Sequence, residues 1–198
     1  SSDTVRAEFA VEDTDRIQRI FIAKRNGDQV DLRRSGSEWL IDGELPASEE
    51  VMENLLDAIN RVDIQSIPNY KSTPSLVRKI SVDGILVRIF GSNDRLLKSY
   101  YVGGATPTEL GTYIIMEESE QPYIAHIPGW DGNLRFRFNL KPDEWRTKWY
   151  FQYEPDEIQS VTVDYPSARA KSFRLDRREE DFLRYASPNC TSIGTATS

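Results

Sequence analysis

His126 is the first side chain to consider as a catalyst, because it is the single histidine of the chain. Histidine can serve as a general base, but a nucleophilic triad also needs an activated serine or cysteine. The sequence contains no Gly-x-Ser-x-Gly motif, which would mark such a serine. His126 stands between Ala125 and Ile127, as expected within a strand, and we interpret it as a structural residue. No catalytic residue is predicted.

Four acidic clusters could bind Ca²⁺ or supply the paired carboxylates of a glycoside hydrolase. They are Glu12-Asp13-Asp15, Glu117-Glu118-Glu120, Glu154-Asp156-Glu157 and Glu179-Glu180-Asp181. None follows the Asp-x-Asp-x-Asp-Gly pattern of a calcium loop, and all flank expected strands or turns, where charge is usually solvated. One cysteine, Cys190, and one histidine cannot form a Cys/His zinc site. We expect no metal and no cofactor, and a carboxylate-based hydrolase stays an alternative.

A third candidate is a stretch that mixes basic and aromatic side chains in a protein whose net charge is -7. Aromatic faces stack on sugars and arginine pairs with carboxylate or phosphate, so this stretch could bind an envelope glycan. The predicted ligand-binding residues are Trp130, Arg135, Arg137, Trp145 and Arg146. The alternative, which we favour, is an amphipathic strand with its aromatic rings inward and its arginines in water.

Composition limits the class of protein. The chain has 198 residues, 38% of them hydrophobic, which suffices for one sizeable domain or two small ones. The acidic balance argues against nucleic acid as a partner, because tracking phosphates needs a concentrated basic face. No apolar run reaches the roughly 18 residues of a membrane span, and no signal peptide opens the chain. The chain begins without Met, so we expect an upstream segment to have been removed.

The clearest structural pattern is a βββα unit over residues 15–67. Asn26-Gly27 is a strong hairpin signal, and Ser35-Gly36-Ser37 predicts a second turn. An amphipathic helix begins at about Glu49, with Ser48 as its N-cap. Its apolar residues share one face at helical spacing and are Val51, Met52, Leu55, Leu56, Ile59 and Val62. This helix must lie on the sheet that the strands form.

Residues 75–150 predict a middle antiparallel β region. A short helix over Leu76–Val82 precedes two hairpins, and Gly103-Gly104 is expected to end the second strand of the first hairpin. Leu134–Leu140 alternates apolar and polar side chains, which predicts another strand. A helical turn that starts with Lys141-Pro142-Asp143-Glu144 would place Trp145 and Trp149 on a shared face.

Residues 156–185 repeat the opening of the first unit. Asp156–Val163 matches Asp15–Ile22, and Phe173–Leu175 matches Val30–Leu32 if the intervening turn is two residues longer. No amphipathic helix follows, because residues 186–198 form a small, polar tail. The fold class is therefore α+β, with antiparallel β-meanders, one main amphipathic helix packed on a sheet and a partial second βββα unit. The second sheet should keep an apolar face that is uncovered or covered by a borrowed element.

The chain resembles an uncharacterised bacterial family, the domain of unknown function 4340, and especially its members from Bacteroides-like bacteria. The resemblance covers residues 9–182 and is carried by Phe9-Ala10-Val11-Glu12-Asp13-Thr14, Val30-Asp31-Leu32-Arg33-Arg34, Trp39-Leu40-Ile41-Asp42-Gly43, Tyr100-Tyr101-Val102-Gly103-Gly104-Ala105-Thr106, Leu110-Gly111-Thr112-Tyr113, His126-Ile127-Pro128-Gly129-Trp130 and Trp145-Arg146. It implies an N-terminal membrane anchor or export signal ahead of residues 1–14, and a body on the outer side of the cytoplasmic membrane. It also implies that the natural chain continues past the second unit.

These observations together predict a non-enzymatic cell-envelope module that binds or braces another envelope component. Some members of the family are thought to act near membrane transport systems, so an accessory role in transport is one form of this prediction. The first alternative is a glycan-binding module, and the second is the carboxylate-based hydrolase. The expected partner is an envelope protein or glycan.

Overall fold

The computed structural model describes residues 2–147, 156–178, 181–186 and 192–195, which belong to two compact units, residues 1–148 and 149–198. Each unit is built around an antiparallel sheet, and the α+β class predicted from the sequence is confirmed. Trp149 and Cys190 lie outside the described residues.

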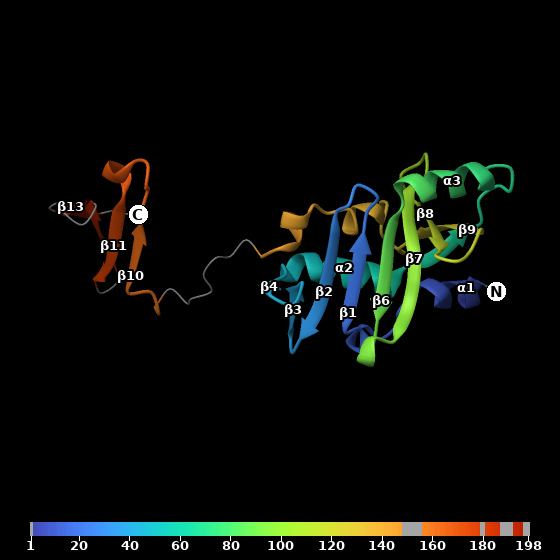
Figure 1. The fold of residues 1–198 in the computed structure, drawn as a ribbon, viewed down its shortest axis with the longest axis horizontal. Coiled ribbons are helices and arrows are strands. Elements are labelled where there is room, and N and C mark those ends of the chain that lie inside the picture. Colours follow the sequence, from blue (N-terminus) through green and yellow to red (C-terminus); the bar gives the residue numbers. More distant parts are fainter. Residues whose placement is uncertain (1, 148–155, 179–180, 187–191, 196–198) are drawn as a thin grey trace. The chain divides into compact units, whose positions relative to one another are not determined.

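The first unit contains a nine-stranded sheet with the order β4-β3-β2-β1-β6-β7-β8-β9-β5 (Figure 1). Its strands are β1 (Arg19–Ala23), β2 (Gln29–Ser35), β3 (Glu38–Ile41), β4 (Leu45–Pro46), β5 (Asp63–Ser66), β6 (Ile85–Phe90), β7 (Leu96–Ala105), β8 (Thr112–Met116) and β9 (Pro122–His126). The inner strand β1 pairs with β2 on one side and with the central strand β6 on the other. The predicted regions 15–67 and 75–150 thus share one sheet.

The hydrophobic core lies on one face of this sheet, because side chains alternate along each strand. In β1, Ile20 and Ile22 are buried while Arg19 and Phe21 are partly exposed. The predicted hairpin turn is present, and Gly27 adopts the positive φ of 95° that favours glycine. The first meander therefore has the face polarity that the sequence predicts.

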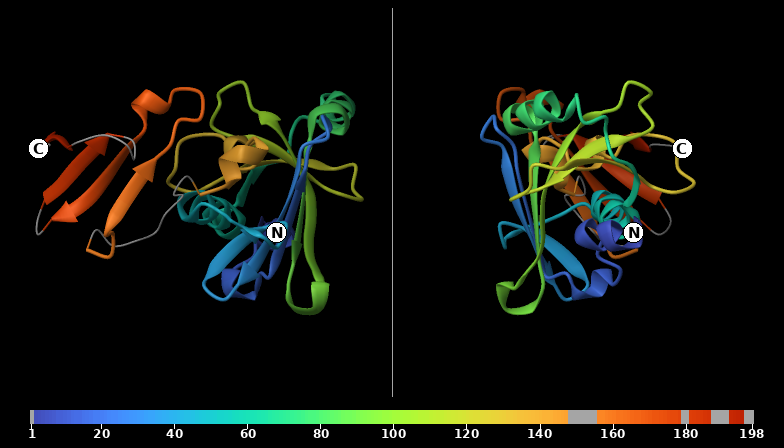
Figure 2. Two further views of the ribbon diagram at one scale, coloured as in Figure 1. Left: turned by 60° about the vertical axis from the view of Figure 1, so that its left-hand side comes forward. Right: turned by 90° about the vertical axis from the view of Figure 1, so that its right-hand side faces the viewer.

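Two helices cover the core face. α2 (Glu49–Arg61) buries Met52, Leu55 and Ile59, and the Ser48 hydroxyl accepts a hydrogen bond from the Val51 amide at 3.5 Å, as predicted for the N-cap. α1 (Ser2–Phe9) occupies the expected lead-in and brings Phe9 against two tyrosine rings of β7 and β9. Figure 2 shows both helices on the same side of the sheet.

A third helix, α3 (Thr73–Asp83), confirms and extends the short helix predicted after the linker. It packs on β7, where a Cβ added to Gly103 would come 2.8 Å from Ile80 Cγ1. The prediction that Gly103-Gly104 ends the strand is wrong, since β7 continues to Ala105 with a register shift after Val102. Glycine is required here for the close approach of a helix rather than for chain reversal.

The strand predicted over Leu134–Leu140 is also wrong. The segment instead contains the 3₁₀ turn η3 (Arg135–Arg137), and the Leu134 amide donates to the Thr112 hydroxyl at 2.7 Å. Leu134, Arg137 and Phe138 are buried, and Phe136 is exposed. The spacing i, i+3, i+4 of the buried residues fits a helical turn, so the alternating pattern was ambiguous. The predicted turn after Lys141 is present as η4 (Pro142–Trp145).

The second unit contains an antiparallel meander in the order β10-β11-β12-β13. Its strands are β10 (Ser160–Val163), β11 (Phe173–Arg178), β12 (Asp181–Ala186) and β13 (Ser192–Thr195), and the 3₁₀ turn η5 (Arg169–Lys171) precedes β11. β13 lies within the segment 186–198 that the sequence predicts to be a polar tail.

The register of β10, β11 and β12 in this second meander reproduces that of β1, β2 and β3 in the first. Val161 pairs with Leu175 as Ile20 pairs with Leu32. Leu175 then pairs with Arg184, in the way that Leu32 pairs with Ile41. The Arg177 amide donates to the Gln159 carbonyl at 2.9 Å, and the Arg34 amide donates to the Gln18 carbonyl at the same distance. The matched positions of the two meanders are called equivalent residues below.

Candidate functional site

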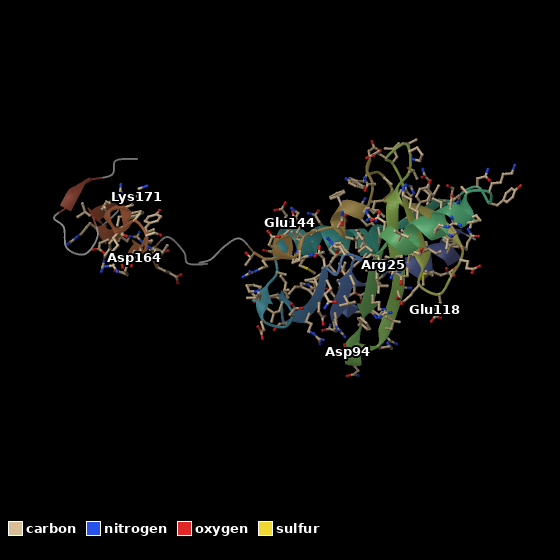
Figure 3. The ribbon with its side chains drawn as sticks, turned by 45° about the horizontal axis from the view of Figure 1, so that its top comes forward. Arg25, Asp94, Glu118, Glu144, Asp164 and Lys171 are labelled. Atoms are coloured by element: carbon tan, nitrogen blue, oxygen red, sulfur yellow. The ribbon has the colours of Figure 1, made fainter. Side chains whose placement is uncertain are left out.

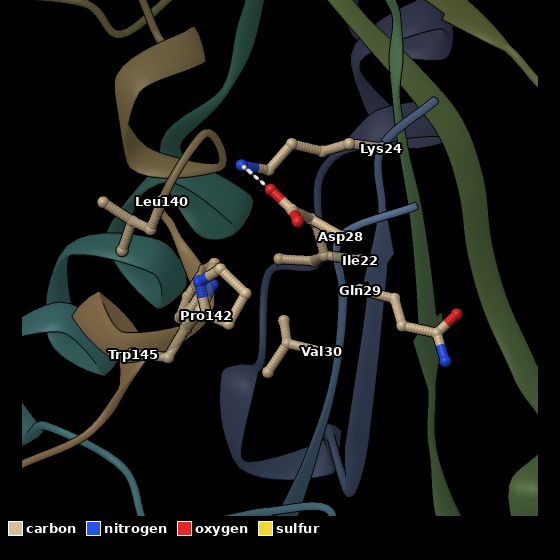
Figure 4. A pocket seen from close by; sticks show the side chains of 8 residues that line it. All are labelled: Ile22, Lys24, Asp28, Gln29, Val30, Leu140, Pro142 and Trp145. Carbon is tan, nitrogen blue, oxygen red and sulfur yellow. Dashed lines mark hydrogen bonds and ion pairs between the residues drawn. The ribbon is translucent and has the colours of Figure 1, made fainter. Parts of the chain in front are cut away.

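Two of the five predicted ligand-binding residues occupy different environments at η4. Trp145 is 2% exposed and packs in the core beside a cavity of about 10 Å³, which is barely enough for one water molecule (Figure 4). Lys24 and Asp28 also line this cavity, and they form an ion pair with 3.4 Å between Lys24 Nζ and an Asp28 carboxylate oxygen. Arg146 is exposed, and its backbone bridges to Ala47. The structure therefore does not bring the Trp145 ring to the surface.

The other three residues lie around η3 and are engaged within the fold. Arg135 donates to the Val102 carbonyl at 3.1 Å and to the Asp83 carbonyl at 2.8 Å, which ties η3 to β7 and to the end of α3. Arg137 is 9% exposed and donates to Asp57 at 2.6 Å. Its guanidinium lies 4.8 Å from the Trp130 ring centroid. These arginines connect elements of the protein instead of pointing into water.

A shallow concavity that is largely open to solvent lies where β1, β2 and the β6–β7 turn meet. We call it the arginine cleft; its volume is about 410 Å³, and it is lined by Gln18, Arg19, Arg33, Arg34, Gly91, Ser92, Asn93 and Asp94. Three of these eight residues are arginines, which carry guanidinium groups. The sheet register positions the cleft, because Arg19 stands opposite Arg33 on β2 and opposite Phe90 on β6.

Arg19 is the arginine of the cleft that contacts both of its neighbouring aspartates. Its Nε donates to Asp31 at 2.8 Å, and its Nη1 lies 3.4 Å from an Asp94 oxygen. The hydrogen bond to Asp31 raises the pKa of Arg19 above its ordinary value. Its guanidinium also lies 4.9 Å from the Phe90 ring centroid, a cation–π distance. Arg19 is thus held as a fixed cation between two carboxylates.

The two neighbouring arginines differ in how they are held. Arg34 donates to the Ile17 and Thr14 carbonyls at 2.9 and 3.0 Å, so its guanidinium fastens the chain that leads into β1. The Arg33 side chain is 45% exposed and donates to Asp31 through Nη2 at 3.0 Å. A half-exposed guanidinium of this kind can bind a carboxylate or phosphate in a bidentate manner.

The turn that closes the cleft is conformationally unusual. Asn93 and Asp94 belong to η2 (Ser92–Asp94) and have φ values of 58° and 51°, in the left-handed region that non-glycine residues seldom adopt. Asp94 lies at the tip of the β6–β7 hairpin (Figure 3), and its side chain is 65% exposed. Asp94 is therefore the exposed partner of Arg19, whereas Asp31 is only 20% exposed.

Two further sequence candidates lie elsewhere in the first unit, whereas the acidic clusters at 154–157 and 179–181 belong to the second unit, with Glu154, Glu179 and Glu180 outside the described residues. His126 is in β9 and pairs with Asp63 of β5 in the sheet, and Glu117 accepts hydrogen bonds from Arg88 and the Ser99 hydroxyl. The Arg88 contact holds the pKa of Glu117 below its ordinary value. Within the described ranges, no group of three or more histidine, cysteine or acidic residues is placed to hold a metal ion.

Known proteins give no guide to this site. Comparisons with protein-family models, curated proteins and solved structures found no match. Among the helices of the described part of the chain, none is long and apolar enough to cross a bilayer. The arginine cleft must therefore be interpreted from its own geometry.

Sequence reasoning missed the arginine cleft because its residues come from three segments. Arg33-Arg34 is visible as a basic pair after Leu32, but its proximity to residues 91–94 depends on the pairing of β1 with β6. A local signal existed in Gly91-Ser92-Asn93-Asp94, which predicted a turn. Nothing in that turn indicated that its aspartate would meet Arg19.

Proposed function

We propose that this protein is a non-enzymatic binding module that recognises an anionic group of a cell-envelope component through the arginine cleft. The observation that carries the proposal is the half-exposed Arg33 beside Arg19, whose Asp94 partner is mostly exposed. A ligand carboxylate or phosphate can bind the Arg33 guanidinium and replace Asp94 at Arg19. The resemblance described above supports the location outside the cytoplasmic membrane, and a role beside a transport system remains part of the proposal.

The arrangement of charges in the cleft favours binding over hydrolysis. Asp31 and Asp94 are two carboxylates near one another, but both contact Arg19. Such a shared cation makes them ion-pair partners rather than an acid and a base with separate environments, which glycoside hydrolysis needs. We therefore place a carboxylate-based hydrolase behind a binding role.

A glycan-binding role has one observation in its favour. The Phe136 ring is 53% exposed and lies 5.7 Å from the Trp130 ring, centroid to centroid, so an aromatic surface exists near η3. A sugar ring could stack there without contacting Trp145. We keep this as the second candidate function.

The test uses backbone NMR with three ligands: inorganic phosphate, a glutamate-rich peptide and a uronic acid oligosaccharide. Shifts should concentrate at Arg19, Arg33 and residues 91–94 for the ligand that matches best. Arg33→Ala should weaken binding by about tenfold, because it removes a charge-assisted contact. Asp94→Asn should strengthen binding, because it removes the competing carboxylate at Arg19.

Arg25→Ala is the matched control, since it also removes one arginine but lies outside the cleft, 6.0 Å from the Tyr101 ring centroid. Equal weakening by Arg25→Ala and Arg33→Ala would mean that net charge alone drives binding, and the cleft would be rejected. Shifts confined to Trp130 and Phe136 would favour the glycan module instead. Fusions of the full-length protein to alkaline phosphatase and to a reporter that is active in the cytoplasm test the location. Activity of the cytoplasmic reporter alone would contradict the proposed location.

A further inference from the structure

The two meanders differ in how the same face is covered. In the first unit the core face of β1 and β2 carries Ile20, Ile22, Val30 and Leu32, and all four are buried. The equivalent residues of the second unit are Val161, Val163, Phe173 and Leu175. Val161 is 38% exposed, and the other three are half-buried. The second sheet thus presents a row of apolar side chains that its counterpart hides completely.

The structure shows what occupies this face in the first unit. α2 begins three residues after β4 ends, and its apolar residues belong to the same core cluster as Ile20 and Leu32. Trp145 of η4 belongs to this cluster too, and with Leu140 it faces Ile22 and Val30 across the small cavity. In the described residues of the second unit, η5 is the single helical segment, and it spans three residues. A three-residue turn cannot replace an amphipathic helix of 13 residues.

Charge around the apolar face indicates the chemistry of its partner. Arg184 is the equivalent of the buried Ile41, and it is exposed, with its guanidinium 4.7 Å from the Phe173 ring centroid. A second copy of this face would bring Arg184 of both copies into one interface, where like charges repel. A helix with acidic residues beside its apolar stripe complements the same surface.

We propose that the face formed by Val161, Val163, Phe173 and Leu175 binds an acidic amphipathic α-helix of a partner protein, in the place that α2 takes on the first sheet. The occupant resembles α2 in character, since α2 combines a buried apolar stripe with Glu49, Glu50, Glu53 and Asp57. Helix-on-sheet docking of this kind places i, i+3, i+4 anchors on the apolar side chains. The proposal is independent of the arginine cleft, which lies in the first unit.

The experiment measures binding of a fluorescent peptide with the sequence of residues 47–62 to the full chain by anisotropy. The peptide carries the α2 sequence and is the helix known to fit the equivalent face. Saturable binding is expected. No saturation at the highest soluble protein concentration would overturn the proposal.

A matched pair of variants locates the binding face. Val161→Glu places a charge on the apolar face and should weaken peptide binding at least about tenfold, because a desolvated charge is unfavourable. Thr162→Glu places the same charge on the next residue, which points to the opposite face, and should leave binding within about twofold. Equal binding to both variants would show that the peptide binds elsewhere, including exchange with α2 itself, and would overturn the proposal.

The contribution of charge is tested by reversing the charge first of Arg184 and then of the peptide. Arg184→Glu should weaken binding of the acidic peptide about tenfold, and a peptide in which the four acidic residues are lysine should recover it. Amide hydrogen exchange of β11 checks that each variant retains its sheet. If sedimentation instead shows a dimer of the full chain that Val161→Glu dissociates, the occupant is a second copy and the partner-helix proposal is rejected.

Discussion

The first three strands of the two meanders, β1 to β3 and β10 to β12, share a pairing register but differ in what their core faces meet. In the first, the face lies in the core with α2, and Ile41 completes an apolar surface. In the second, Arg184 stands at the position of Ile41 and the face is partly exposed. The comparison shows that the pairing pattern of a meander can persist while its covering helix is absent from the described chain. Register and burial are thus separable properties.

The largest effect should come from making the first unit resemble the second. Ile41→Arg would bury a guanidinium at a position that is 6% exposed and would cost more than about 4 kcal/mol. We expect the first unit to lose its protected amides in β1 and β2, as measured by hydrogen exchange. The reverse change, Arg184→Ile, should alter the stability of the second unit by less than about 0.5 kcal/mol. Similar losses from both changes would contradict the difference in covering.

A medium effect is expected from equivalent leucines. Leu32→Ala removes a fully buried side chain and should cost about 3 kcal/mol, because it leaves a cavity in the core. Leu175→Ala should cost about 1 kcal/mol, since Leu175 is half-buried and solvent already reaches its surroundings. Urea dependence of amide exchange in β2 and β11 measures the two values separately. Equal costs would show that the second face is covered as well as the first.

The smallest effect concerns ion pairs, and it depends on pH. Glu117 accepts hydrogen bonds from Arg88 and Ser99, so Glu117→Gln should cost about 1 to 2 kcal/mol at pH 7. The pKa of Glu117 is lowered from its ordinary 4.5, chiefly by the Arg88 hydrogen bond. The carboxylate therefore stabilises the fold above pH 4.5, and this contribution is lost as pH falls through the lowered value.

The control for this pH effect is the exposed pair Arg174–Asp176 of the second unit, joined at 2.6 Å. The Arg174 side chain is 55% exposed, and Asp176→Asn should change stability by less than about 0.5 kcal/mol. Chemical unfolding of each variant at pH 7 and at about pH 3.5 makes the comparison. A difference between wild type and Glu117→Gln that stays constant over this range would contradict the ion-pair interpretation.

Local patterns predicted most of the elements. α2 was predictable because its apolar residues recur at helical spacing behind a serine cap, and the first hairpin because Asn-Gly favours a tight turn. The strand predicted at Leu134–Leu140 failed because its side chains fit two periods, and hydrogen bonds to Thr112 and Asp57 selected the helical turn. Those bonds join residues distant in sequence, which no local pattern can reveal.

The candidate site was harder to predict than the fold, for the same reason. Trp145 and Arg137 were predicted ligand-binding residues, with an alternative, the favoured one, that placed aromatic rings inward and arginines in water. The structure buries the Trp145 ring, as that alternative expects, but it also buries Arg137. No binding role was predicted for Arg33, because no local pattern marks it. It became part of a cleft because β6 pairs with β1 and brings the turn at Asn93 beside it.

The pairing of β1 with β6 also has a consequence for how the chain folds during synthesis. β1 leaves the ribosome long before β6, and in that interval its backbone on the β6 side has no strand partner. Unpaired strand edges promote association between nascent chains, and closing so long a loop slows folding. One edge of β1 therefore stays unpaired until Ile85–Phe90 is synthesised and pairs with it. In the finished nine-stranded sheet the same edge lies in the interior.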